Sequence, residues 1–272
     1  ICSRIIDQAS IAASEGATLF CVPAPLLTGM QPTSLIDYAN FEHDIIASLE
    51  EVAAHVEKLG IVCVVPAVVV YENVPLFEAF ILKEGRVIPS RSIIAQQHGM
   101  QGDDAWLPPV FDVDGTRVAV TFDLARDLDS LPCGTDMVLY FQVNGFDETN
   151  SLTCAVASVR DGGFTNEVAR SGMWMACMAP LGGYDESVFT GGSFVMDDAG
   201  RVVAASPCFE EDLLIVDVRH GMSIEPVESD ALPRFCREEW VWHALELHMR
   251  DMFRARGFAR AVLPLDGGLA SA

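Results

Sequence analysis

Basic side chains are scarce in this sequence. Of 272 residues, 17 are Lys or Arg and 39 are Asp or Glu, which gives a net charge of −22 near neutral pH. A surface with this balance repels phosphate backbones and anionic lipid headgroups. We therefore expect neither nucleic acid nor a membrane among the partners of the protein.

Paired cysteines and long apolar runs are lacking as well. The eight cysteines are spread singly without a CxxC pair, as expected for small buried side chains in a reducing compartment. The longest apolar run, Ile61 to Val70, contains Pro66 and is shorter than the roughly 20 residues of a membrane-spanning helix. These absences predict a cytoplasmic protein whose core needs no disulfides.

Helix-like and strand-like segments alternate in the first half of the chain. Apolar residues at helical spacing predict helices over residues 1–15 and from Phe41 to Lys58. Continuous apolar runs predict buried strands from Thr18 to Val22 and from Ile61 to Val70. This alternation is typical of strands joined by helical crossovers.

Hairpins dominate the later part. Turn-forming pairs at Glu84-Gly85 and Asp114-Gly115 separate short strand-like runs. A helix is expected within 151–171, and further strands are expected at Val118–Phe122, Asp136–Val143, Met173–Met178, Val188–Met196, Arg201–Ala205 and Leu213–Val218. The mixture predicts an α/β fold with mixed sheets covered by helices.

The composition changes after residue 220. A polar stretch with two prolines predicts a linker over residues 221–235. A helix is expected from Cys236 to Arg256, and a new strand from Ala259 to Leu265. We thus expect a domain over 1–220, the linker, and the start of a second domain over 236–272, with core residues of the helix at Trp240, Leu245, Met249 and Phe253.

Several segments, in order along the chain, carry a resemblance to one family. The run Gly16 to Gly29 resembles the strand and turn that bear the glutamate of carbon–nitrogen hydrolases, and Val118 to Asp123 resembles the strand that bears their cysteine. Gln96-Gln97-His98 stands where that family has its lysine. The stretches Gly182–Ser193 and Leu265–Ala272 are similar to segments specific to glutamine-dependent NAD synthetases.

The resemblance implies a fold and an activity. It implies a nitrilase-like αββα sandwich that hydrolyses glutamine with a Glu-Lys-Cys triad, followed by a linker helix and the first strand of an ATP pyrophosphatase-type synthetase domain. There, ATP with Mg activates nicotinic acid adenine dinucleotide, and ammonia displaces AMP to give NAD. It further implies a strand ahead of Ile1, so that one sheet should lack an edge or borrow one, and association of sandwich domains into a homo-oligomer.

The residues needed for this chemistry are replaced. Amide hydrolysis of this kind needs a thiolate, a carboxylate that takes its proton and a cation that stabilises the oxyanion. The aligned positions hold Ala24 for the carboxylate, Gln96 for the lysine and Thr121 for the cysteine. A slip of one residue would place Gln97 or Phe122 there instead. None of these side chains can perform the assigned step.

Other constellations offer weak substitutes. A pair of Cys133 and His98 is conceivable, and Glu239, His243 and Glu246 share a helix face at metal-compatible spacing, but a solvated face is the simpler interpretation and no metal is expected. Gly182-Gly183 favours a turn or close packing over an anion cradle. Candidates for the substrate pocket, taken from the resemblance, are Tyr184, Asp185, Phe189 and Ser193.

The final loop departs from its family in the same way. The residues of the pyrophosphate loop are Asp266, Gly267, Gly268 and Ser271, with Asp266 in place of the first serine and Ala270 in place of the aspartate. A carboxylate about 4 Å from a phosphate repels it by ~1 to 4 kcal/mol. This sequence therefore argues against ATP binding by the loop, and we expect no cofactor in the first domain.

Two hypotheses follow. The first is a catalytically inactive glutaminase-type domain that serves as a scaffold or regulatory subunit, with its own or a partner synthetase domain as its main partner and no support for glutamine binding. The second is an active amidohydrolase or NAD synthetase that uses residues other than Ala24, Gln96 and Thr121. If the alignment holds, these three positions should converge on one small pocket.

Overall fold

The structure is a computed structural model. It describes residues 1–29, 38, 40–72, 74–91, 110–147, 159, 162, 164–184, 186–218, 224–228, 231–264 and 266–268. No helix among these residues is long and apolar enough to cross a membrane.

One sheet and two helices come from the first ninety residues. The elements in chain order are α1 (Cys2–Ser14), β1 (Leu19–Cys21), α2 (Phe41–Leu59), β2 (Val62–Tyr71), β3 (Val74–Lys83) and β4 (Arg86–Pro89). The strands lie in the order β1-β2-β3-β4, with β1 parallel to β2 and the other pairs antiparallel. Helix α2 has acidic residues in its first turn and ends at Gly60 in the left-handed conformation, as its sequence predicts.

A second sheet of six strands follows. Its elements, and those that pack on it, are β5 (Val110–Val113), β6 (Thr116–Thr121), α4 (Leu124–Asp127), the 3-10 turn η1 (Leu128–Ser130), β7 (Met137–Phe141), α6 (Thr165–Ser171), β8 (Trp174–Met178), β11 (Phe194–Met196) and β12 (Val202–Ala205). The order is β12-β11-β8-β7-β6-β5, with β6, β7 and β8 parallel to one another.

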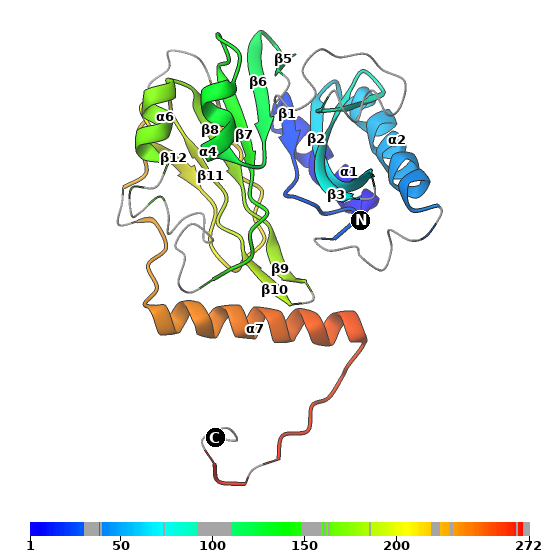
Figure 1. The fold of residues 1–272 in the computed structure, drawn as a ribbon, viewed down its shortest axis with the longest axis vertical. Coiled ribbons are helices and arrows are strands. Elements are labelled where there is room, and N and C mark those ends of the chain that lie inside the picture. Colours follow the sequence, from blue (N-terminus) through cyan, green and yellow to red (C-terminus); the bar gives the residue numbers. More distant parts are fainter. Residues whose placement is uncertain are drawn as a thin grey trace.

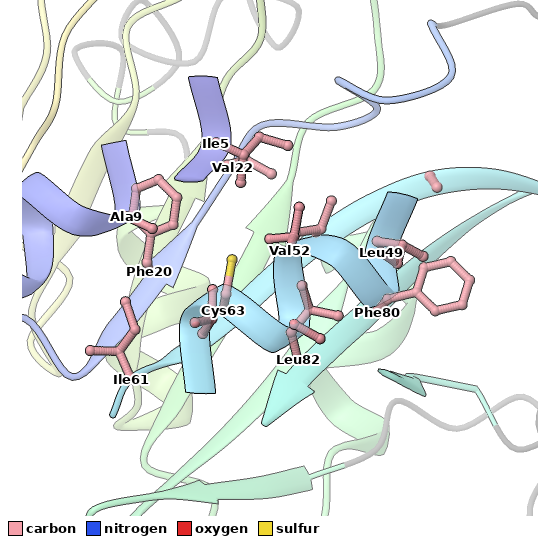
Figure 2. Close-up of a cluster of buried hydrophobic side chains, with 14 of the residues drawn as sticks. Ile5, Ala9, Phe20, Val22, Leu49, Val52, Ile61, Cys63, Phe80 and Leu82 are labelled. Carbon is pink, nitrogen blue, oxygen red and sulfur yellow. The ribbon is translucent and has the colours of Figure 1, made fainter. Parts of the chain in front are cut away.

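The two sheets pack face to face between layers of helix (Figure 1). Side chains from both sheets, among them Val64, Ile81, Val120 and Leu139, form one buried cluster between them, which we call the inter-sheet core. A second cluster joins the first sheet to α1 and α2, where Ile5 and Ala9 lie over Phe20 and Val22 (Figure 2). A third joins the second sheet to α4 and α6. The predicted αββα sandwich is therefore confirmed.

Both predicted hairpins are confirmed, and the backbone conformation of their turn residues explains why they form. Glu84 and Gly85 have φ of 52° and 72°, and Asp114 and Gly115 have φ of 50° and 85°. Two successive residues with positive φ give a turn whose twist matches that of the flanking strands. These turns set the β3–β4 and β5–β6 pairings.

A long helix crosses one end of the molecule. Helix α7 (Arg237–Arg256) lies against a separate hairpin, β9 (Leu181–Tyr184) and β10 (Ser187–Thr190) (Figure 1). A Cβ atom on Gly183 would lie 2.9 Å from the Cα of His248, so the helix can approach only because this residue is glycine. Close packing, predicted for Gly182-Gly183, is confirmed.

Part of the predicted core of α7 was wrong. Leu245 and Met249 are 58% and 48% exposed, whereas the buried residues are Trp240, Ala244 and Leu247. Both sets follow helical spacing, so the sequence pattern alone did not reveal which face the hairpin covers.

Two predicted strands do not form. Leu213–Val218 and the described residues 259–264 have no strand pairing in the structure, because no neighbouring strand offers them a ladder. Leu214, Val216 and Val218 nevertheless pack on the inter-sheet core. The strand β8 is fully enclosed in its sheet, so its Trp174 and methionines belong to the core of the monomer. Of the helix expected within 151–171, the described part contains α6.

Candidate functional site

Ala24 lies in the inter-sheet core just after β1. It is 3% exposed and packs in one cluster with Val64, Ala79 and Ile81. A methyl group at this place accepts no proton, and it is enclosed by apolar side chains. The position that the resemblance assigns to the catalytic carboxylate is therefore an ordinary part of the core.

Thr121 and Phe122 point to opposite faces at the end of β6. Successive side chains of a strand alternate between its faces, and Val118 and Val120 belong to the inter-sheet core. Phe122 also packs there, together with Ala24. Thr121 faces the layer of α4, where its hydroxyl contacts Asp127. Ala24 and Phe122 therefore pack in the same inter-sheet core, and Thr121 does not.

The Thr121 hydroxyl is engaged on its own face. It donates a 2.7 Å hydrogen bond to the Asp127 carboxylate and accepts one of 2.9 Å from the Asp123 backbone N–H. Arg126 pairs with the same carboxylate at 2.9 Å, and this bond raises the pKa of the guanidinium. Thr121 and Asp127 are both buried. These hydrogen bonds stabilise the turn between β6 and α4. They also engage the Thr121 hydroxyl with the Asp127 carboxylate.

Asp123, which was not among the predicted site residues, occupies the turn itself. It is the N-cap of α4, and its side chain accepts a hydrogen bond from the Arg126 backbone N–H. Its place after a strand that ends in a short helix was predictable from Asp as a capping residue. Here the carboxylate is exposed and serves the cap.

Phe122 takes part in a row of aromatic rings at the inter-sheet core. Its ring lies 5.9 Å from that of Phe77 and 5.7 Å from that of Phe141, and the Arg91 guanidinium carbon lies 5.6 Å from its centroid. Aromatic and cation–π contacts of this kind each contribute about 0.5–1.5 kcal/mol beyond burial. Phe122 and Phe141 of this row belong to the packing of the same inter-sheet core as Ala24.

Glu78 is a buried titratable group that was not among the predicted site residues. It is 0% exposed on β3, and its Oε1 accepts hydrogen bonds from the backbone N–H groups of Ala79, Ser90 and Arg91 and from the Ser90 hydroxyl. Its Oε2 has no partner among the described residues. Burial raises the pKa of Glu78 to about 6, against the lowering effect of Ser90 and Arg91.

A carboxylate in the middle of an apolar strand is unusual, and that alone could have drawn attention to Glu78. Its hydrogen bonds tie the end of β4 to β3 and fix Ser90 and Arg91, and hence the Arg91 side chain over Phe122. The structure thus gives Glu78 a structural task at the junction of β3 and the end of β4.

Cysteines near this region are poor nucleophiles. Burial raises the pKa of the Cys21 thiol to about 12 and that of Cys63 well above its usual range, with the neighbouring Cys21 adding to the shift at Cys63. The thiolate is the nucleophilic form. Cys133 is exposed and lies in the loop before β7.

The remaining candidates fall into two groups. Gln96, Gln97, His98, Asp185 and Ser271 lie outside the described residues. Glu239 accepts a hydrogen bond from the Cys236 backbone N–H and so caps α7. On the same helix, His243 Nδ1 lies 3.7 Å from Glu246 Oε2. Within the described ranges, no cluster of three or more metal-binding side chains is found.

The proposed pocket residues of the β9–β10 region pack among themselves. The rings of Tyr184 and Phe189 meet edge to face at 5.7 Å, and burial, helped by Asp251, raises the pKa of Tyr184. Ser193 accepts a 3.0 Å hydrogen bond from the Ala179 backbone N–H. Asp251 of α7 accepts a hydrogen bond from the Gly183 backbone N–H, so this region anchors the helix.

The final loop folds on itself where it is described. The Asp266 carboxylate accepts a 2.9 Å hydrogen bond from the Gly268 backbone N–H, and Gly267 has a φ of 78°. This is the local turn that aspartate favours, and it occupies an N–H that a phosphate would need.

Comparison with known proteins places the chain among homologues of one kind. No family model matches it. It is 28% identical over 278 residues to the glutamine-dependent NAD(+) synthetase of Rhodobacter capsulatus, covering 95% of this chain and 48% of that protein. The enzyme of the same name from Xylella fastidiosa strain 9a5c is 27% identical, with 99% and 51% covered. The chain spans about half the length of these relatives.

Solved structures agree on the fold. The glutamine-dependent NAD+ synthetase of Acinetobacter baumannii, solved with ADP, superposes with a TM-score of 0.75 at 20% identity, covering 98% of this chain and 51% of that one. The NitN amidase of Neterenkonia sp. AN1 superposes with a TM-score of 0.62 at 19% identity, covering 80% and 86%.

Proposed function

We propose that this chain, a homologue of glutamine-dependent NAD synthetases with the nitrilase-superfamily fold, is a glutaminase-type domain that no longer hydrolyses glutamine. Its task is then that of a scaffold or regulatory part of such an enzyme. One observation carries the proposal: the inter-sheet core holds Ala24 together with Phe122, and neither side chain can take or give a proton.

The chemistry supports this reading on both sides of β6. A hydrolase of this kind needs its base and its nucleophile to act as a unit, and losing one member of such a unit costs on the order of 10⁶ in rate. On the inter-sheet side there is neither carboxylate nor thiol at Ala24 and Phe122. On the other side the Thr121 hydroxyl is bound to Asp127, away from Ala24.

The partners follow from the same family. A domain of this type has its own or a partner synthetase domain to act upon, and it assembles into a homo-oligomer. We assign no cofactor to the sandwich itself. ATP and Mg belong to the synthetase domain, and the closed turn at Asp266 speaks against ATP binding by the loop in this chain.

Glutamine turnover tests the proposal directly. The purified chain, incubated with glutamine, is expected to release no ammonia above the buffer background. A glutamine-analogue chloroketone is expected to leave its intact mass unchanged. The variant Thr121→Cys should also stay unlabelled, because its thiol would lie beside the Asp127 carboxylate, which disfavours the thiolate.

Labelling combined with turnover would overturn it. Stoichiometric modification of a cysteine together with steady ammonia release would show that another residue is the nucleophile. The matched variant Cys133→Ser identifies one such residue, since it would lose both signals if the exposed Cys133 were responsible.

An active amidohydrolase is the second candidate, and Glu78 is the observation that favours it. Carboxyl groups with raised pKa values occur often in active sites. If Glu78 were a catalytic base, Glu78→Gln would abolish ammonia release from an active wild type while the protein stays folded. An inactive wild type rejects this candidate at once.

A further inference from the structure

Helix α7 has an apolar side that the rest of the described chain does not cover. The helix packs on β9 and β10, and its buried residues include Trp240 and Leu247. Trp242, Leu245 and Met249 are exposed. In Figure 1, no other described helix or strand lies beside the side of α7 that faces away from the hairpin. These exposed side chains are therefore available for a contact with another molecule.

The exposed residues belong to a stripe with the spacing of a helix–helix contact. Its members recur in alternating steps of four and three residues, as in two helices that pack side by side. The members of this α7 stripe are Glu238, Trp242, Leu245, Met249, Met252 and Arg256. All are exposed except Met252, which is half-buried. The stripe thus has an acidic end, an apolar centre and a basic end.

A second copy of the helix that runs in the opposite direction matches this stripe. Leu245 then meets Met249 of the second copy, and Trp242 meets Met252, a sulfur–aromatic contact that is favourable. Glu238 meets Arg256 of the second copy, and the two-fold symmetry repeats each contact at the other end. The helix dipoles are also opposed in this arrangement, which favours the pairing.

The charges distinguish this arrangement from a parallel one. In a parallel pair each residue of the stripe meets its own copy, which places Glu238 against Glu238 and Arg256 against Arg256. Like charges in direct contact repel, so the ends of the stripe select the antiparallel direction. On one flank of the stripe, Glu246 and Arg250 lie one turn apart. Antiparallel pairing brings Glu246 of each copy near Arg250 of the other, so this flank is complementary as well.

We propose that α7 is a site of self-association, at which two copies of the chain pair antiparallel through the α7 stripe, about a two-fold axis midway between Leu245 and Met249. The inference rests on the homo-oligomer of the proposed function and assigns a contact to it. A single pair of helices buries less area than a standard interface of about 1,600 Å². The net charge of −22 opposes the contact as well. The dissociation constant is therefore expected in roughly the micromolar range.

Charge reversal tests the partner and the direction together. Sedimentation velocity over a dilution series measures the dissociation constant, at a salt concentration of about 0.15 M that screens charges more than about 8 Å apart. We expect Glu238→Arg and Arg256→Glu each to raise it about tenfold, because each variant places like charges at both ends of the pair. Net charge alone would instead make Glu238→Arg associate more tightly. An equimolar mixture of the two variants should return to the wild-type value, since each end then joins opposite charges. So should the double variant, whose net charge equals that of the wild type.

A second variant tests the apolar centre. Leu245→Asp places two carboxylates beside the axis, and we expect it to abolish the dimer. Ile11→Asp, at an exposed position of α1, adds the same charge and is the matched control, for which we expect a dissociation constant close to that of the wild type. Circular dichroism at a concentration where the wild type is monomeric checks the fold, which should be unchanged in both variants because both side chains are exposed.

Three results would overturn the proposal. Dimers of Leu245→Asp or of both charge variants with the wild-type dissociation constant would place the contact elsewhere. A mixture of the charge variants that associates no better than either one alone would exclude the antiparallel arrangement. A single species of 29.5 kDa at every concentration would reject the pairing together with the proposed homo-oligomer. Each of these leaves the proposed loss of glutaminase activity standing, because that proposal rests on Ala24, Phe122 and Thr121.

Discussion

At the scale of single residues, the most informative group is Glu78. Its charge is held in an apolar strand by four donors on one oxygen, and the other oxygen finds no donor in the described part of the chain. Burying a carboxylate with one oxygen unpaired costs free energy in the charged form. This cost raises the pKa of Glu78 to about 6. Stability should therefore depend on pH through this one residue.

The expected dependence has a definite sign. The folded pKa of Glu78, about 6, lies above an unfolded value of roughly 4.3. Its contribution is most favourable below about pH 4, where both states are protonated, and is lost as pH rises through 6. For Glu78→Gln relative to wild type, we predict that the free energy of unfolding gains about 2 kcal/mol between pH 4 and pH 7.

Urea unfolding at intervals of one pH unit measures this difference. Glu84→Gln, in the exposed β3–β4 turn, is the matched control and should show no such gain. A difference between Glu78→Gln and wild type that stays constant with pH would contradict a raised pKa at this site.

The Thr121 hydroxyl gives a second prediction at this scale. Thr121→Val keeps the shape of the side chain but leaves the buried Asp127 carboxylate without its 2.7 Å donor. Leaving a buried acceptor unpaired costs about 1–3 kcal/mol, and we expect a loss of that size in chemical denaturation. Thr116→Val, at the half-exposed start of the same strand, should change stability by less than about 0.5 kcal/mol. Equal effects at both positions would show that the contact with Asp127 contributes nothing.

At the scale of elements, the sequence predicts local features well and pairings less well. Residue types with special backbone preferences predict some local features. These features are the turns at Glu84-Gly85 and Asp114-Gly115 and the glycine that ends α2. Whether Leu213–Val218 forms a strand depends on a neighbouring strand with which it can pair, and the local sequence pattern does not indicate whether one is present. The same holds for the site: the resemblance pointed to Ala24 and Thr121, but only the alternation of β6 showed that Phe122 shares the face of Ala24.

Helix α7 allows a matched test of which face is buried. Leu247 is 2% exposed, whereas Leu245 is 58% exposed on the same helix. Leu247→Ala should lower the free energy of unfolding by about 2–5 kcal/mol through the cavity it creates. Leu245→Ala should change it by less than about 0.5 kcal/mol, since alanine is at least as good a helix former. Thermal or urea unfolding of the pair measures the contrast, and a reversed order would mean that α7 packs on the β9–β10 hairpin through its other face.

At the scale of the whole molecule, net charge and apolar surface have opposite effects on association between copies of the chain. A net charge of −22 keeps copies of the chain apart, yet half of its residues are hydrophobic. The enclosed strand β8 accounts for part of that excess as core. Another part lies in the open on α7, where Trp242, Leu245 and Met249 are 69%, 58% and 48% exposed. Monomers seldom expose neighbouring apolar side chains of this size without a contact to cover them.

We therefore predict that the chain self-associates, and that salt strengthens the association. Raising ionic strength shortens the Debye length from about 10 Å at 0.1 M to about 3 Å at 1 M, which weakens the repulsion between acidic surfaces while leaving apolar contacts intact. Sedimentation velocity at micromolar concentration should show a species heavier than the 29.5 kDa monomer at moderate salt, and more of it at higher salt. The variant Trp242→Ser reports whether Trp242 takes part: a shift toward monomer places the contact on α7, and no shift means that the contact does not depend on Trp242. A single species of 29.5 kDa at every salt concentration would contradict self-association.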